Sequence, residues 1–117
     1  MYKAGVDVGS TTVKVVIFDD HEKLVFSRYE RHFSDVKTAT IKVLNDAISE
    51  IGDQTVSIAI TGSGGMGLAD VAKIPFVQEV IAATTTVEHF IPETDVVIEL
   101  GGEDAKTTFF GDALEQR

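Results

Sequence analysis

The sequence predicts a mixed α/β domain with the element order β-β-β-α-β-α, followed by a C-terminal β-hairpin. Two observations predict this class. Near the amino terminus, apolar and polar residues alternate in three short segments that are separated by turn residues. Beyond them, a segment with helical periodicity, a short alternating segment and two further helical segments follow one another.

The three alternating segments predict an antiparallel meander of short strands. They cover residues 4–8, 13–19 and 24–32. In the second segment, Val13, Val15 and Ile17 share one face, and Lys14 and Val16 lie on the other. This alternation is typical of a strand that is buried on one side only.

A helix is predicted at 35–51, because apolar residues recur there at helical spacing. Ser34 is the expected N-cap, with Asp35 in the first turn, where a negative charge is favourable. Gly52 is the expected C-cap.

The remaining segments predict a strand, a glycine-rich loop, a short helix, a longer helix and two more strands around a turn. They cover 56–61, 62–65, 66–73, 79–90, 95–100 and 105–110. Three meander strands followed by α/β units describe a ribonuclease-H-like lobe, expected over 1–92. Residues 93–117 are predicted to be the opening hairpin of a truncated second lobe.

Composition narrows the function classes. The chain has 117 residues and a formal net charge of −9, which disfavours nucleic acid as a partner. No segment predicts a membrane span or a signal peptide, and there is no cysteine, so a cytoplasmic protein is expected.

The first candidate site is the segment Asp7-Val8-Gly9-Ser10-Thr11-Thr12-Val13-Lys14. A carboxylate within an apolar strand requires a cation, water or hydrogen-bond donors. Successive amides in a glycine turn can bind an anion, and Lys14 adds positive charge. The segment therefore predicts a site for hydrated Mg²⁺ and phosphate, with an ordinary hairpin turn as the alternative.

The second candidate site is Glu99-Leu100-Gly101-Gly102-Glu103-Asp104-Ala105-Lys106. It repeats the design of the first, with an acid at a strand end, a glycine turn and then a lysine. Two such hairpins would clamp phosphates from two sides. The alternative is a Gly-Gly hairpin with solvated acids.

The glycine-rich loop at 62–65 lacks the lysine of a P-loop and the spacing of a dinucleotide fingerprint. A flexible connection or hinge is therefore the favoured interpretation. The alternative is a loop that lines a ligand cleft, since it follows a strand and precedes a helix. His21, His32 and His89 show no metal-ligand spacing and are expected at the surface or half-buried.

Four motifs carry a resemblance to a known family. They are VDVGSTTVK at 6–14, ITGSGG at 60–65, QEVIAA at 78–83 and VIELGGEDAK at 97–106. In order and spacing they resemble the ATPases that activate 2-hydroxyacyl-CoA dehydratases, the BadF/BadG/BcrA/BcrD family, which includes the CoA-substrate-specific enzyme activases. These belong to the actin/hexokinase/heat-shock-chaperone ATPase superfamily.

The resemblance implies site residues on both hairpins. Asp7 would face Mg²⁺ through water, and Glu99 and Asp104 would be further catalytic carboxylates on the metal side or the water side. The residues that would bind ATP or ADP are Gly9, Ser10, Thr11, Thr12, Lys14, Gly101, Gly102 and Lys106.

The resemblance also implies partners. In such activators, ATP hydrolysis drives low-potential electron transfer from a homodimer with a bridging [4Fe-4S] cluster. The electron acceptor is a dehydratase component or a fused dehydratase-like domain. The cluster ligands are absent from this cysteine-free chain, so it is expected to be the N-terminal part of a larger ATPase and inactive when isolated.

The chain departs from the pattern at two places. Glu99 stands where activators often have Asp, and Ser63 and Gly65 stand where they often have an aromatic and a basic residue. The alternatives are a carbohydrate or acyl kinase of the same superfamily, a non-redox nucleotide-switched assembly or chaperone module, and an interaction domain without nucleotide.

Overall fold

The computed structural model describes residues 1–90, 93, 96–100, 105–109 and 115–116. The chain divides into two compact units, Met1–Val77 and Gln78–Arg117. The expected boundary between 92 and 93 concerns the lobes of a longer protein and stays a prediction. None of the helices in the described residues is long and apolar enough to cross a membrane.

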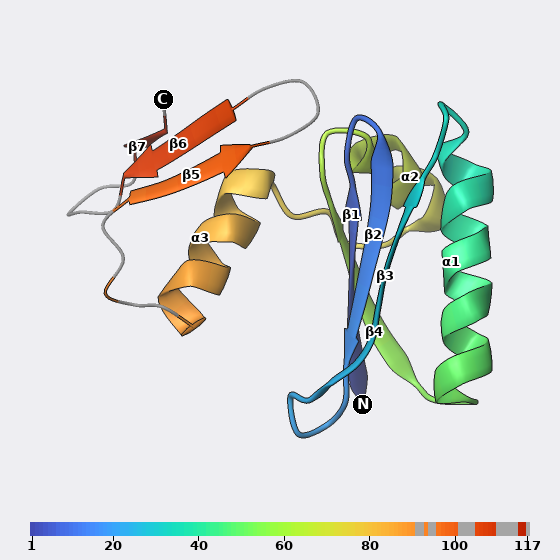
Figure 1. Ribbon diagram of the computed structural model, residues 1–117. Coiled ribbons are helices and arrows are strands. Elements are labelled where there is room, and N and C mark those ends of the chain that lie inside the picture. Colours follow the sequence, from blue (N-terminus) through green and yellow to red (C-terminus); the bar gives the residue numbers. More distant parts are fainter. Residues whose placement is uncertain (91–92, 94–95, 101–104, 110–114, 117) are drawn as a thin grey trace. The chain divides into compact units, whose positions relative to one another are not determined.

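The first unit is built on a four-stranded mixed sheet with the order β3-β2-β1-β4 (Figure 1). Its strands are β1 (Tyr2–Val8), β2 (Thr12–Phe18), β3 (Leu24–Arg31) and β4 (Val56–Thr61). β1 pairs with β2 antiparallel and with β4 parallel, and β2 pairs with β3 antiparallel. The predicted meander and its continuation by the fourth strand are confirmed.

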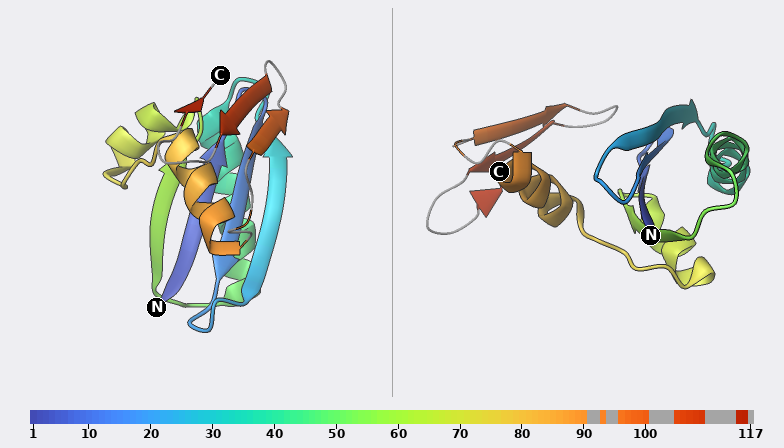
Figure 2. Two further views of the ribbon diagram at one scale, coloured as in Figure 1. Left: turned by 90° about the vertical axis from the view of Figure 1, so that its left-hand side faces the viewer. Right: turned by 90° about the horizontal axis from the view of Figure 1, so that it is seen from below.

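Helix α1 (Val36–Ile51) covers one face of this sheet (Figure 2). The alternating residues of β2 turn Val13, Val15 and Ile17 into the core, and the helix contributes Val43 and Ala47. The predicted amphipathic packing is therefore confirmed. Ile48 is different, because it lies at the margin of the apolar stripe and is 62 % exposed.

The beginning of α1 differs from the prediction by one residue. The N-cap is Asp35, whose Oδ1 accepts a hydrogen bond from the Thr38 amide at 3.2 Å, and not Ser34. Ser34 and Phe33 have left-handed backbone angles, with φ of 65° and 48°. Both Ser34 and Asp35 have capping side chains, and the turn that precedes the helix decides between them. Gly52 is the C-cap, as predicted.

After β4 comes helix α2 (Gly65–Ala72). The chain then returns to the sheet, where Phe76 forms a parallel bridge with Ile60. The Ile60 amide donates to the Pro75 carbonyl at 2.9 Å, and the Val77 amide donates to the Ile60 carbonyl at 2.8 Å. Residues 75–77 thus extend the sheet beyond β4, a role that the sequence did not predict.

The second unit contains α3 (Glu79–Phe90), β5 (Val96–Leu100), β6 (Ala105–Phe109) and the two-residue strand β7 (Glu115–Gln116). β5 and β6 pair antiparallel, which confirms the predicted hairpin. β7 pairs with β6 and was not predicted.

Candidate functional site

The candidate site lies at one edge of the first sheet. Because β1 and β4 are parallel, their carboxyl ends meet at the same edge. The β1–β2 turn and the loop from β4 to α2 follow these strands and lie side by side (Figure 1). The Gly64 amide donates to the Val8 carbonyl at 2.9 Å and joins the two segments.

Three polar residues form a row across this edge. Asp7 of β1 is the register partner of Lys14 on β2 and of Thr61 on β4. The Lys14 Nζ atom lies 4.0 Å from Asp7 Oδ2, and both side chains are about half exposed. The sequence predicted the proximity of Asp7 and Lys14, since both belong to one hairpin.

Most acceptors of the β1–β2 turn are occupied. Four of the five carbonyls from Val8 to Thr12 accept hydrogen bonds from backbone or side-chain donors of the protein. The pairs are Gly64 N–H to Val8 (2.9 Å), His32 Nε2 to Gly9 (2.9 Å), His32 N–H to Thr11 (3.0 Å) and Gly9 N–H to Thr12 (2.8 Å).

Two backbone donors of the same turn, the amides of Ser10 and Thr11, remain available to a ligand. Ser10 and Thr11 are exposed, and within the described residues their amides donate to no protein acceptor. A turn in which most carbonyls are engaged and two neighbouring amides are free presents positive partial charge to the solvent. This arrangement suits an anion.

The loop at 62–65 is a packed part of the site, and not the flexible connection that was predicted. Gly62 has φ of 100°, and a Cβ placed there would lie 2.2 Å from the Val8 oxygen and 2.6 Å from Asp7 Oδ1. A Cβ at Gly64 would lie 3.0 Å from Val8 Cγ1. Glycine is therefore required for the close approach of the two segments.

Two residues of the site were missed in the sequence. His32 was expected at the surface or half-buried, but it is 8 % exposed and bonds to the β1–β2 turn. Thr61 belongs to the motif at 60–65, but no role was predicted for its side chain. Its Oγ1 is buried and has no hydrogen-bond partner among the described residues. The one available signal was that Thr61 directly precedes the glycine loop.

The second predicted hairpin is described in part. Glu99 of β5 and Lys106 of β6 are register partners, so the hairpin brings these two positions together. The other predicted residues of this motif, Gly101, Gly102 and Asp104, lie outside the described residues.

The residues at this edge of the first sheet fit a hydrated magnesium ion. In the described part of the chain, no group of three or more His, Cys, Asp or Glu residues could enclose a metal. Mg²⁺ usually keeps several waters and takes one or two carboxylates together with phosphate oxygens. The half-exposed Asp7 beside the unpaired Thr61 hydroxyl agrees with that demand. An iron–sulfur cluster does not fit, since the chain contains no cysteine.

The sheet order, the covering helix and this edge define one lobe of the actin-like ATPase fold, which confirms the predicted fold class. No family model matches the sequence. The 2-hydroxyisocaproyl-CoA dehydratase activator of Clostridioides difficile is 32 % identical over 109 residues, which cover 91 % of this chain and 40 % of that protein.

Two solved structures extend the comparison. An activator of the 2-hydroxyisocaproyl-CoA dehydratase from Clostridium difficile, with bound ADPNP, has a TM-score of 0.83 at 27 % identity over 100 % of this chain and 46 % of that one. The Acidaminococcus fermentans (R)-2-hydroxyglutaryl-CoA dehydratase component A has a TM-score of 0.81 at 18 % identity, over 100 % and 47 %. The resemblance to dehydratase activators is confirmed, and the chain spans less than half the length of these relatives.

Proposed function

We propose that this chain is the nucleotide-binding part of an ATPase that activates a 2-hydroxyacyl-CoA dehydratase. The observation that carries the proposal is the β1–β2 turn, where the Ser10 and Thr11 amides are free and which directly follows the strand end that bears Asp7. A phosphate chain with its magnesium ion requires this combination of donors and a carboxylate. The similarity to dehydratase activators supports the choice of reaction.

In this proposal the amides of Ser10 and Thr11 and the hydroxyl of Thr12 bind phosphate oxygens of ATP or ADP. Gly9, whose own amide is bonded to the Thr12 carbonyl, allows the phosphates to approach the backbone closely. Lys14 supplies positive charge from the neighbouring strand. Bound magnesium would supply Lewis acidity at the phosphates. Asp7 holds and orients the water shell of that ion through its carboxylate.

The residues of the second motif are proposed to bind the phosphates as well. In this proposal Gly101 and Gly102 contact the phosphates, and Lys106 supplies positive charge. Glu99 and Asp104 are proposed to orient water or metal ligands. The pairing of the Glu99 and Lys106 positions supports this role, because it repeats the pairing of Asp7 and Lys14.

The partner in this proposal is a dehydratase component or a fused dehydratase-like domain, which receives an electron from the complete activator. A homodimer and a cytoplasmic location belong to the same proposal. Because this chain has no cysteine, the ligands for a [4Fe-4S] cluster have to come from outside its 117 residues.

Substitution of Asp7 tests the proposal. In the full-length protein encoded by the native gene, Asp7→Ala and Asp7→Asn should each lower the rate of ATP hydrolysis by about 10²–10³-fold, the effect of losing one transition-state interaction. Nucleotide affinity should change much less, because the carboxylate acts mainly on charge that develops during the reaction. The assay is phosphate release under saturating MgATP.

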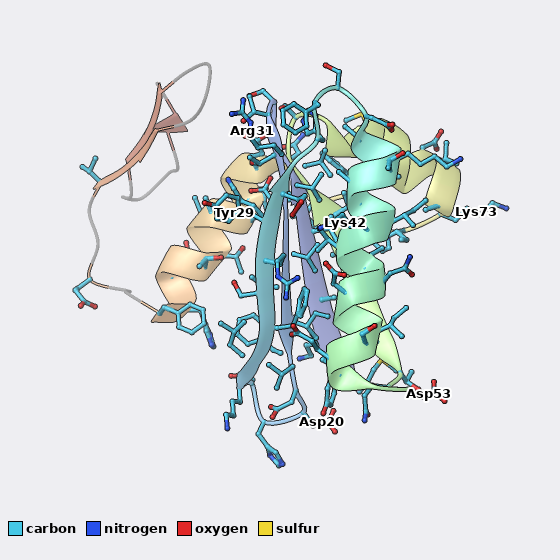
Figure 3. The ribbon with its side chains drawn as sticks, turned by 45° about the vertical axis from the view of Figure 1, so that its right-hand side comes forward. Asp20, Tyr29, Arg31, Lys42, Asp53 and Lys73 are labelled. Atoms are coloured by element: carbon cyan, nitrogen blue, oxygen red, sulfur yellow. The ribbon has the colours of Figure 1, made fainter. Side chains whose placement is uncertain are left out.

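Asp53→Asn is the matched control. Asp53 is exposed and follows α1, at the opposite end of the sheet from Asp7 (Figure 3). Its substitution should leave hydrolysis unchanged. If Asp7→Asn retains full activity, the charge has no role and Asp7 only braces the hairpin. If the wild-type protein neither binds nor hydrolyses MgATP, the proposed function is wrong.

A further inference from the structure

We propose that His32 is the positioning residue of the anion-binding turn. Its imidazole holds the Gly9 carbonyl away from the ligand and thereby keeps the Ser10 and Thr11 amides directed outward. This inference rests on the proposed function, because it assigns a role within the same site.

The first argument is the set of bonds that His32 makes. Its backbone amide donates to the Thr11 carbonyl at 3.0 Å, and its ring Nε2 lies 2.9 Å from the Gly9 oxygen. One residue thus engages two of the four carbonyls of the turn. A carbonyl turned toward the solvent at this place would repel the negative charge of a phosphate.

The second argument is the tautomer of the ring, which its two hydrogen-bond partners determine. The Ser34 amide donates to His32 Nδ1 at 3.0 Å, so Nδ1 carries no hydrogen. In the neutral ring the hydrogen therefore lies on Nε2, which donates it to the Gly9 oxygen. Both ring nitrogens are used, each in one role, which holds the imidazole in one orientation.

The third argument is the strain in the segment that follows. Phe33 and Ser34 have φ of 48° and 65°, a region that costs non-glycine residues about 1–2 kcal/mol each. This backbone brings the Ser34 amide back to His32 Nδ1. A strained segment persists where its surroundings over-determine it, and it accompanies functional sites.

The surroundings of His32 fit a role in positioning. The residue is 8 % exposed and follows directly after β3, whose last residue, Arg31, is the register partner of Thr12 (Figure 3). It therefore lies behind the turn and leaves the outward face to Ser10 and Thr11. An apolar side chain at position 32 would fill the same space without holding the Gly9 carbonyl.

Two substitutions separate the two bonds of the ring. His32→Gln keeps an N–H donor near the position of Nε2 and loses the acceptor at Nδ1. His32→Asn keeps an acceptor near Nδ1 and loses the donor toward Gly9. Both variants lose one hydrogen bond and the ring volume, so a purely structural role predicts similar losses of stability and of ligand affinity for the two.

A positioning role predicts different ligand affinities. Calorimetric titration of the full-length protein with a non-hydrolysable MgATP analogue should give His32→Gln a Kd within about twofold of the wild type. His32→Asn should weaken binding about five- to tenfold, the value of one hydrogen bond. In this chain without ligand, the carbonyl ¹³C shift of Gly9 should change in the Asn variant and stay near the wild-type value in the Gln variant.

The control pair is His21→Gln and His21→Asn. His21 is exposed in the β2–β3 turn, at the opposite end of the sheet, and neither substitution should change the Kd. If the wild type binds the analogue and the two His32 variants have the same Kd, whether equal to that of the wild type or weaker, the inference is overturned while the proposed function stands. If the Gly9 signal responds equally to both variants, the assigned bond is wrong. If the wild type does not bind, the proposed function fails and the inference fails with it.

Discussion

Gly62→Ala tests whether the glycine loop at 62–65 packs closely against the end of β1. The φ of Gly62 is 100°, outside the range that alanine normally adopts. The new Cβ would also lie 2.2 Å from the Val8 oxygen and 2.6 Å from the Val8 carbonyl carbon. These neighbours are backbone atoms of a buried strand, so a side-chain rotation cannot relieve the overlap.

The expected loss in the free energy of unfolding is the sum of a backbone cost and a steric cost. The left-handed backbone costs alanine about 1–2 kcal/mol, and the forced displacement of packed atoms costs about 1–3 kcal/mol. The free energy of unfolding should therefore fall by roughly 2–5 kcal/mol. Because Asp7 Oδ1 lies 2.6 Å from the new Cβ, the proposed ATP hydrolysis should also slow in this variant.

Two other glycines provide matched controls. Gly52 has φ of 77° and ψ of −161°, a region that is essentially restricted to glycine, but no atom lies within 4 Å of its added Cβ. Gly52→Ala should therefore cost only a backbone contribution of about 1–3 kcal/mol. Gly67 lies in α2 with open space at its Cβ, and Gly67→Ala should stabilise the protein by about 0.5–1 kcal/mol.

Urea unfolding followed by tyrosine fluorescence is the appropriate assay. The chain has no tryptophan and two tyrosines, Tyr2 and Tyr29, which both belong to the first unit. The signal therefore reports on the unit that contains Gly62. If Gly62→Ala costs no more than Gly52→Ala, the close packing of the loop against Val8 is refuted.

Three further predictions follow from single contacts. Thr61→Val should raise the free energy of unfolding by about 1 kcal/mol, because it removes a buried hydroxyl without a partner; a loss of stability in denaturant titration would argue against this. Asp35→Ala should lower the stability by about 1 kcal/mol through the lost cap, and Ser34→Ala should cost less than half of that; equal losses on thermal unfolding would contradict the assignment of the cap. The hydrogen bond from the Lys23 amide holds the pKa of Asp19 below its usual value of 3.8. The stabilisation by this carboxylate is thus present above pH 3.8 and is lost as the pH falls through its folded pKa; an NMR titration midpoint at or above 3.8 would refute this.

The local elements could be predicted from the sequence alone. The alternation in β2 and the helical spacing in α1 reflect which face each element buries. This pattern involves only residues that are close together in the sequence. The Asp7–Lys14 pair was predictable for the same reason, since a tight turn determines the register of the hairpin. The N-cap of α1 was misplaced by one residue, because Ser34 and Asp35 are equally good caps by composition.

The tertiary structure alone decided the rest of the site. Thr61 and the glycine loop reach Asp7 through the parallel pairing of β4 with β1, which a separate α-helical crossover makes possible. His32 reaches Gly9 because β3 ends beside the turn that begins β2. Such contacts join residues far apart in the chain, and residue spacing carries no signal for them. Local periodicity therefore determined the strands and helices and the Asp7–Lys14 pair of the site. Long-range strand pairing determined which other side chains and amides meet there.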